Sequence, residues 1–257
     1  MKLGIAYNVF DGTELLKQSI EQVRGLADFI VVVGQEKSNF GERIPKWTKD
    51  YLMDALTLVD ASMDFEPDDS VAHRNELRKR NMGLERCKRA GCTHFMTMDA
   101  DEFYDAEELK RAMEKFEAGD YDASACMMQT YYGLPTHALD PPEAYYVPLI
   151  YKIDMRSFMM GQQFPVIADP TRKMRTEKFL AFGRDEIEMH HFSYLRKDIR
   201  LKLRNSSART NFNDRVVELA SYYDSWAPGK QASLAGREER YYDLKIVENK
   251  FNIEWQK

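Results

Sequence analysis

The sequence has few cysteines and no long apolar run, and these absences exclude several classes of protein. Cys87, Cys92 and Cys126 are the only cysteines in 257 residues, too few for a chain of this size to depend on disulfides. No second Cys or His pair completes a zinc tetrahedron with Cys87 and Cys92. No apolar stretch approaches the ~18 residues that would span a bilayer. The first ten residues also lack the features of a secretory signal, so we expect reduced thiols and a cytoplasmic location.

An excess of positive charge is lacking too. The chain has 37 Lys and Arg against 42 Asp and Glu, a formal net charge of −5, which leaves no overall electrostatic footprint for nucleic acid. The composition is nevertheless 44% hydrophobic and 12% aromatic, whereas disordered chains are poor in such residues. We therefore expect a folded globular protein that does not bind duplex nucleic acid.

Apolar runs and helical periodicity alternate along the first half of the chain. Residues 3–7 and 29–33 are predicted strands with a helix from Thr13 between them, and such a unit favours a right-handed crossover between parallel neighbours. The further elements predicted here are helices at 47–56, 72–90 and 106–117 and strands at 57–59 and 93–98.

The second half of the chain favours an extension of this sheet. Strands are predicted at 123–132, 145–153 and 186–194, with longer loops between them. The fold class expected is therefore α/β, with a mixed sheet flanked by helices over residues 1–195. Residues 196–257 are charged and mostly helical in pattern, and we predict that they form a C-terminal helical extension packed on the same core.

The most informative segment follows the strand at 93–98, which runs directly into Asp99-Ala100-Asp101. Ligands gather at the carboxyl ends of strands in an open α/β sheet, and residues i and i+2 of an extended chain point to the same side. The two carboxylates are thus expected to converge and to need a cation between them. Mg²⁺ or Mn²⁺ suits oxygen ligands and is often held jointly with substrate phosphates, so the pattern predicts a metal-bound diphosphate.

Asp-x-Asp also has other interpretations. Such a pair also occurs by chance in solvated loops. Phosphatases of the haloacid dehalogenase type place theirs near the amino terminus, and an EF-hand needs Gly at the position that Tyr104 occupies. The last two are excluded by the residues themselves.

At four places the sequence resembles glycosyltransferases of the GT-A fold, most of all the family 2 group that uses nucleotide sugars. The four segments are Ala6-Tyr7-Asn8, Arg80-Asn81-Met82-Gly83, Met98-Asp99-Ala100-Asp101-Glu102 and His191-Phe192-Ser193-Tyr194-Leu195-Arg196. The resemblance implies the GT-A fold and the transfer of a sugar from a nucleoside-diphosphate sugar, of UDP type, to a hydroxyl of a glycan or other acceptor.

The resemblance also implies roles for residues. Asp101 and His191 would bind the metal, and Asp99 would contact it through water or would contact the ribose. The donor side would be formed by Tyr7, Asn8, Arg80, Asn81 and Arg196. The metal would act as a Lewis acid on the departing diphosphate. The alternatives are a buried histidine for His191 and solvated charges for the two arginines.

An inverting enzyme needs a carboxylate as general base, and the candidates are Asp185, Glu186 and Asp169. A retaining enzyme would not need one, so the stereochemistry stays open. The nucleobase stays open as well, because residues 34–38 lack the adjacent aspartates that family members often have. Tyrosines at 131, 132, 145 and 146 are either stacking faces for acceptor sugars or part of the core.

Two rival functions remain at this point. A sugar nucleotidyltransferase would show a Gly-rich phosphate loop after the first strand, where residues 8–12 fit poorly. A non-catalytic carbohydrate-binding domain would use the aromatic residues without needing the acidic pair.

Overall fold

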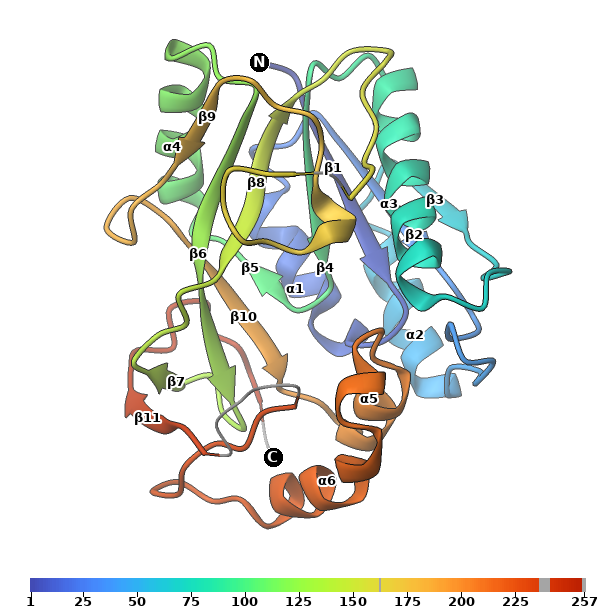
Figure 1. The fold of residues 1–257 in the computed structure, drawn as a ribbon, viewed down its shortest axis with the longest axis vertical. Helices are drawn as coiled ribbons and strands as arrows, with labels where there is room; N and C mark the ends of the chain where they lie inside the picture. Colours follow the sequence, from blue (N-terminus) through green and yellow to red (C-terminus); the bar gives the residue numbers. More distant parts are fainter. Residues whose placement is uncertain (162, 236–240, 256–257) are drawn as a thin grey trace.

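The computed structural model describes residues 1–161, 163–235 and 241–255. A long central sheet runs through the molecule with helices on both of its faces, and α5 and α6 gather at one end (Figure 1). The helices are α1 (Thr13–Val23), α2 (Lys46–Leu56), α3 (Ala72–Arg89), α4 (Ala106–Ala118), α5 (Ile199–Asn205) and α6 (Val216–Ser225), with 3-10 turns η1 (Pro170–Arg172), η2 (Arg209–Asn211) and η3 (Asn213–Arg215). The strands are β1 (Leu3–Val9), β2 (Phe29–Gly34), β3 (Ala61–Asp64), β4 (His94–Asp99), β5 (Glu102–Phe103), β6 (Ala123–Tyr132), β7 (His137–Asp140), β8 (Tyr146–Lys152), β9 (Phe179–Ala181), β10 (Glu188–Tyr194) and β11 (Asp243–Ile246).

The sheet has a parallel core and an antiparallel flank. Its order is β11-β7-β6-β8-β4-β1-β2-β3, and β1 lies between β2 and β4 and is parallel to both. β8 is antiparallel to β4 and β6, while β10 is parallel to β6 and antiparallel to β5. The expected fold class, a mixed α/β sheet flanked by helices, is confirmed. Because β1, β2 and β4 are parallel, their carboxyl ends meet at one edge of the sheet.

The two faces of β1 build two parts of the core. Leu3, Ile5, Tyr7 and Val9 pack with the apolar sides of α1 and α4. Ala6 points to the other face, where α3 lies. α3 approaches closely there because it presents Gly83, on which an added Cβ would lie 2.5 Å from the Cβ of Ala6.

Two expectations from the sequence need correction. The third strand is β3 at 61–64 and not at 57–59, which forms a turn after α2 in which the Thr57 N–H donates to the Asp54 carbonyl. The tail beyond 195 contains helices but also β11, which pairs with β7. Residues 236–240 and 256–257 of the expected extension lie outside the described residues, and the domain boundary stays a prediction. In the described part of the chain, no helix is both long and apolar enough to cross a membrane.

Candidate active site

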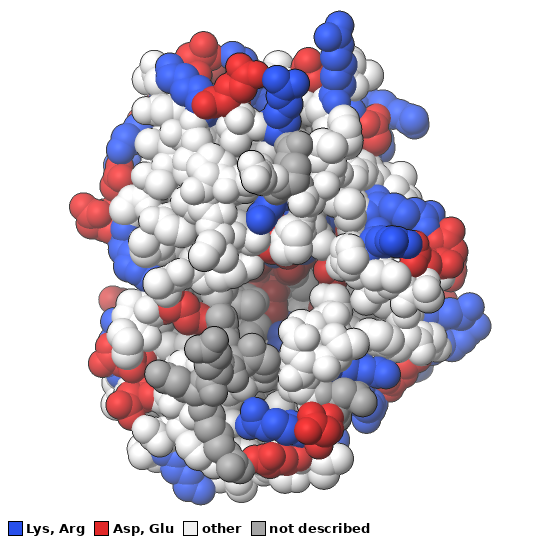
Figure 2. Space-filling view, viewed as in Figure 1, with Lys and Arg blue, Asp and Glu red and all other residues white. Residues whose placement is uncertain are grey.

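A pocket of about 240 Å³ lies at the carboxyl ends of β1, β2 and β4. Figure 2 shows a hollow near the middle of the molecular face, with acidic side chains at its floor. The pocket is lined by Asn8, Phe10, Asp11, Gln35, Asn39, Glu76, Lys79, Asp99, Ala100, Asp101, His191, Arg196, Lys202, Asn205, Ser206 and Ser207. The sequence therefore places residues from the parallel core, from β10 and from the tail around one cavity.

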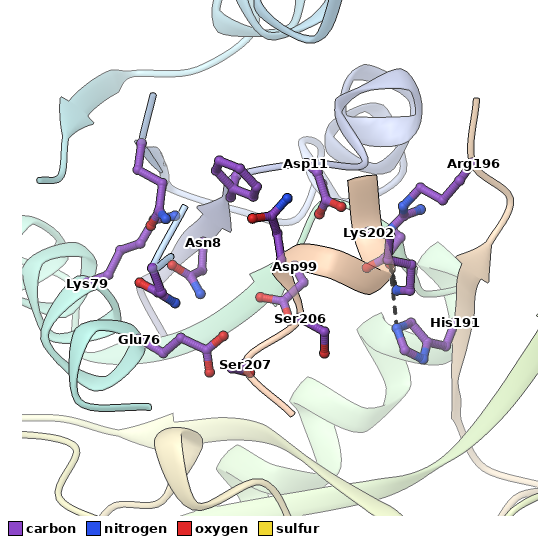
Figure 3. A pocket seen from close by; sticks show the side chains of 16 residues that line it. Asn8, Asp11, Glu76, Lys79, Asp99, His191, Arg196, Lys202, Ser206 and Ser207 are labelled. Atoms are coloured by element: carbon purple, nitrogen blue, oxygen red, sulfur yellow. Dashed lines mark hydrogen bonds and ion pairs between the residues drawn. The ribbon is translucent and has the colours of Figure 1, made fainter. Parts of the chain in front are cut away.

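The two ends of this pocket differ in chemistry (Figure 3). One end holds Asn8, Glu76 and Lys79, and the other holds His191, Arg196 and Lys202, with Asp99 between them. Gln35, Asn39 and the ring of Phe10 also line the pocket. The Oδ1 atoms of Asn8 and Asn39 are buried and have no hydrogen-bond partner among the described residues. Buried polar atoms are almost always paired, so these two are suited to a ligand that brings N–H or O–H donors.

Lys79 is enclosed by protein and is 2% exposed. Its Nζ donates a hydrogen bond to the Val9 carbonyl at 2.6 Å. Burial lowers the pKa of Lys79 to about 7, although the neighbouring carboxylates of Asp99 and Glu76 act in the opposite direction. The side chain is therefore a donor whose charge is only partly retained at neutral pH.

The carboxylate of Asp99 is held by two arginines. Its Oδ2 accepts hydrogen bonds from Arg172 at 2.7 Å and from Arg80 at 3.2 Å. Its Oδ1 lies 3.0 Å from Arg80 Nη2 but accepts no hydrogen bond within the described residues. Burial would raise the pKa of Asp99, but the charges of Arg80 and Arg172 outweigh it and leave this pKa below its usual value.

Asp101 is more deeply placed, at 4% exposure. Its Oδ2 forms an ion pair with Arg196 and lies 3.6 Å from His191 Nε2 and 3.9 Å from Lys202 Nζ. Burial acts to raise the pKa of Asp101, and Arg196 and His191 reverse this so that it lies well below its usual range. Asp101 is thus a permanent anion at the charged end of the pocket.

Asp101 and His191 are spaced almost like two ligands of one divalent ion, although the same Asp101 oxygen is already ion-paired with Arg196. Ligands of one Mg²⁺ or Mn²⁺ lie roughly 3 Å apart, since each is about 2.1 Å from the metal, and the carboxylate oxygen and imidazole nitrogen here are 3.6 Å apart. No group of three or more His, Cys, Asp or Glu side chains in the described part of the chain could hold an ion. A metal at this place would therefore have to displace Arg196 from Asp101 and take further ligands from water or from a bound molecule.

The neighbouring His190 faces away from the pocket. Its Nδ1 is hydrogen-bonded to the Tyr131 hydroxyl at 2.8 Å, and its ring packs against Phe251. Burial lowers the pKa of His190 to about 4. The expectation that only one of the two histidines reaches the site is met, since successive residues of β10 point to opposite faces.

Several of the residues expected at the donor side lie elsewhere. Tyr7 is buried against α1, where its hydroxyl is hydrogen-bonded to Ser19. Asn81 faces the loop after β8: its Oδ1 accepts from the Met159 N–H at 2.8 Å and its Nδ2 donates to the Met159 carbonyl at 3.0 Å. Both are absent from the pocket lining, whereas Asn8, Asp99 and Arg196 are part of it. Arg80 lies just behind the pocket and holds Asp99.

The three candidate bases are also separated. Asp185 and Glu186 precede β10 and do not line the pocket, and Glu186 forms an ion pair with Lys115 on α4. Asp169 instead joins the charged network, because its Oδ2 lies 3.9 Å from Arg80 Nη2 and 3.6 Å from Arg172 Nε. Of the three, Asp169 is the one that lies near Arg80 and Arg172, the two arginines that also hold Asp99.

The four tyrosines that were expected either to stack on acceptor sugars or to belong to the core differ in burial. Tyr131 and Tyr132 are buried, and Tyr131 stacks on Phe192 at 4.3 Å between ring centroids. Tyr145 is partly buried against the core and Tyr146 is half-buried. Tyr131 and Tyr132 are therefore core residues and offer no stacking face to a sugar.

Sequence reasoning did not assign roles to Arg172, Lys79 and Glu76. One face of α3 carries Glu76, Lys79, Arg80 and Gly83, at the spacing i, i+3, i+4 and i+7. This spacing could have predicted from the sequence that the four residues face the same side. Arg172 lies in an irregular loop with no periodicity, so its place could not be read from the sequence.

A second pocket of about 180 Å³ shares His191, Lys202 and Ser206 with the first. Met128 and Phe212 give it an apolar wall, and Thr130 and Ser193 add hydroxyl groups. The two pockets thus form neighbouring parts of one site, on either side of His191 and Lys202.

Comparison with known proteins gives likeness in structure only. No protein-family model matches the chain, and no curated protein matches it in sequence. Residues 1–349 of S. aureus TarS are similar at a TM-score of 0.48 and 12% identity, over 88% of this chain and 73% of that one.

Two further TarS structures are similar in the same way. Full TarS matches at a TM-score of 0.46 and 13% identity, over 89% of this chain and 44% of TarS, so this chain spans less than half of that protein. The complex of TarS 1–349 with UDP-GlcNAc matches at 0.38 and 18% identity, over 52% of this chain and 36% of that one.

Proposed function

We propose that this chain transfers a sugar from a nucleoside-diphosphate sugar to a hydroxyl of a glycan or other acceptor, with UDP-sugars as the first donors to test. The observation that carries the proposal is the two-ended chemistry of the pocket. The amides of Asn8, Gln35 and Asn39 and the ring of Phe10 suit a nucleoside. Arg196 and Lys202, at the other end, suit a diphosphate.

Asp101 and His191 are the residues that would hold Mg²⁺ or Mn²⁺. Such an ion, when bound, neutralises the charge that develops on a departing diphosphate. Arg196 and Lys202 add positive charge beside the same carboxylate. Arg80 donates to Thr97, Thr171 and Asp99, so we assign it to positioning Asp99 and not to phosphate.

None of the three candidate bases lines either pocket, so we assign no general base and place Asp169 in the charged network that holds Asp99. In an inverting reaction the acceptor oxygen would form a bond to the anomeric carbon, the bond from that carbon to the diphosphate oxygen would break, and the hydroxyl proton would pass to a base. We place the sugar towards the second pocket, next to His191 and Lys202.

The rival nucleotidyltransferase is less well supported. The segment after β1 contains a single glycine, Gly12, and a Cβ there would lie 2.8 Å from Arg196 Nη2. Gly12 also has a φ of +72° at the start of α1, and one glycine does not make the Gly-rich phosphate loop that a nucleotidyltransferase would show.

Calorimetry with UDP, GDP and dTDP, with Mn²⁺ or with EDTA, tests the proposal. We expect one nucleoside diphosphate to bind in the presence of Mn²⁺, and we expect His191→Ala and Asp101→Asn to weaken binding at least tenfold. Asp185→Asn is the matched control and should bind as the unmodified chain does. The melting temperature of each variant shows whether it is folded.

Three outcomes contradict parts of this reading. Binding that neither EDTA nor the two site variants change would overturn the metal role. No binding of any of the three nucleotides would overturn the transferase. Release of pyrophosphate from a nucleoside triphosphate and a sugar phosphate would favour the nucleotidyltransferase.

A further inference from the structure

Arg172 reaches the active site from a long irregular loop that is tied down at several points. This loop follows β8 and includes η1. Tyr151 donates its hydroxyl hydrogen to the Arg172 carbonyl at 2.7 Å. Lys88 Nζ donates to the carbonyls of Met155 and Ser157. Together with the contacts of Asn81, these bonds fix the backbone that carries Arg172.

The guanidinium of Arg172 is buried and contacts three carboxylates, two from the Asp-x-Asp segment and one from its own loop. It donates through Nη1 to Glu102 Oε2 at 3.0 Å and through Nη2 to Glu102 Oε1. Nη2 also donates to Asp99 Oδ2 at 2.7 Å, and Nε lies 3.6 Å from Asp169 Oδ2. A planar fork with donors in fixed directions can orient several acceptors at once, which a lysine ammonium cannot do.

Glu102 is the buried ion-pair partner of Arg172. It is 2% exposed, and burial raises its pKa while Arg172 acts to lower it. Its Oε2 also accepts a hydrogen bond from the Asp99 backbone N–H at 3.1 Å. The side chain of Glu102 therefore links Arg172 to the backbone of the Asp-x-Asp segment.

The orientation of Asp99 follows from these contacts. Two arginine donors occupy its Oδ2, and this leaves Oδ1 as the buried oxygen with no hydrogen bond in the described part of the chain. Asp99 lines the pocket between the nucleoside end and the charged end. Oδ1 is closed off from solvent and lies 3.0 Å from Arg80 Nη2, so the two arginines hold the whole carboxylate in place at the pocket wall.

We infer that Arg172 is a positioning residue of this site: backed by Glu102, it fixes the Asp99 carboxylate between the two ends of the pocket, where a nucleoside diphosphate would bind, and it keeps Asp169 beside Asp99. The inference rests on the proposed function. A purely structural role would be to neutralise the buried charge of Glu102, and that role can be separated by experiment.

The experiment compares two variants by melting temperature and by UDP affinity with Mn²⁺ in calorimetry. Arg172→Met leaves Glu102 as an unpaired buried charge and should lower the melting temperature strongly, because an uncompensated charge in the interior is costly. The double variant Glu102→Gln with Arg172→Met removes both charges and should regain most of that loss. We expect it nevertheless to bind UDP at least tenfold more weakly than the unmodified chain.

Two further variants complete the test. Arg172→Lys keeps a positive charge opposite Glu102, and we expect it to be folded with UDP affinity reduced at least fivefold. Arg175→Met is the control, since Arg175 is an exposed arginine of the same loop, and it should change neither quantity.

The outcomes separate the two claims. If the unmodified chain binds UDP, and either the folded double variant or Arg172→Lys binds it equally well, this inference is overturned and the proposed function stands. If the unmodified chain binds no nucleoside diphosphate, both are overturned.

Discussion

Burial in the pocket wall strongly lowers the pKa of a single residue, Lys79. Its pKa is about 7 in the folded chain, against about 10.4 in an unfolded one. Between these values the unfolded state binds more protons than the folded state, so the free energy of unfolding rises with pH from about 7 to about 10. Lys79→Met should remove this contribution, and the gain in stability between pH 7 and pH 9 should shrink by about 2 kcal/mol.

Urea denaturation of the unmodified chain and the variant at the two pH values measures this difference. Lys110→Met, a change at an exposed position of α4, should leave the gain as it is. An equal gain in the unmodified chain and in Lys79→Met would contradict a buried, partly neutral amine.

The residues of the site were predictable only where they stand in a regular pattern. Asp99, Asp101 and His191 follow or lie within strands, and the alternation of side chains predicted that His190 and His191 face opposite ways. Asn81 belongs to the same motif as Arg80, yet its side chain secures Met159. A motif gives the residue types but does not show which neighbour each side chain meets after the chain has folded.

At the scale of elements, α3 is placed by its contact with β1. Gly83 lets the helix approach until its Cα faces Ala6, and the added Cβ of Gly83→Ala would be 2.5 Å from the Cβ of Ala6. We expect the substitution to lower the free energy of unfolding by about 1–3 kcal/mol, as overpacking does in other cores. Because α3 also carries Lys79 and Arg80, UDP affinity should fall with it.

Gly25→Ala is the matched control, since nothing lies within 4 Å of a Cβ at that position. Thermal melting and UDP calorimetry of both variants check the prediction. Equal stability of the two would show that α3 can move away from β1 without cost.

Elements with a clear period were predicted to within a few residues, and those without one were not. β1, β2, β4 and β6 are buried apolar runs, and α3 and α4 have apolar faces, so the pattern alone located them. The third strand was misplaced because the β-branched run at 57–59 resembles a strand, while β3 alternates half-buried and exposed residues at the sheet edge. The loop with η1 has no period, and its conformation depends on distant partners on α3 and β8.

At the scale of the whole molecule, the site brings together segments that lie far apart in the sequence of an acidic chain. The net charge is −5, yet Arg80, Arg172, Arg196 and Lys202 come together around Asp99 and Asp101. Each cation is close to a carboxylate, so the charges of the cluster compensate one another within the chain, and under the proposed function Arg196 and Lys202 would exchange partners when a diphosphate binds. The sequence shows these charged residues, but it could not show that Arg80, Arg172 and Arg196 lie close together in the fold.

Residues of the C-terminal tail also pack against the strands that carry site residues. Phe251 packs against Phe103 of β5 and against His190 and Phe192 of β10, with ring centroids 5.3, 4.9 and 5.9 Å apart. Gln18 Nε2 also donates to the Phe251 carbonyl at 3.3 Å. β5 and β10 pair with Glu102 opposite His191, so the tail braces the two strands that carry these site residues.

Phe251→Ala should therefore lower the free energy of unfolding by about 3–5 kcal/mol, the usual cost of deleting a buried phenylalanine. The folded variant should also bind UDP more weakly, because β5 and β10 lose the ring that holds them in register. Ile246→Ala, at a side chain that is 81% exposed in β11, should change neither value. Urea denaturation and calorimetry measure both effects. A loss below about 1 kcal/mol for Phe251→Ala would mean that residues 241–255 do not hold β5 and β10 in place, and the candidate site would then owe its shape to the first 235 residues.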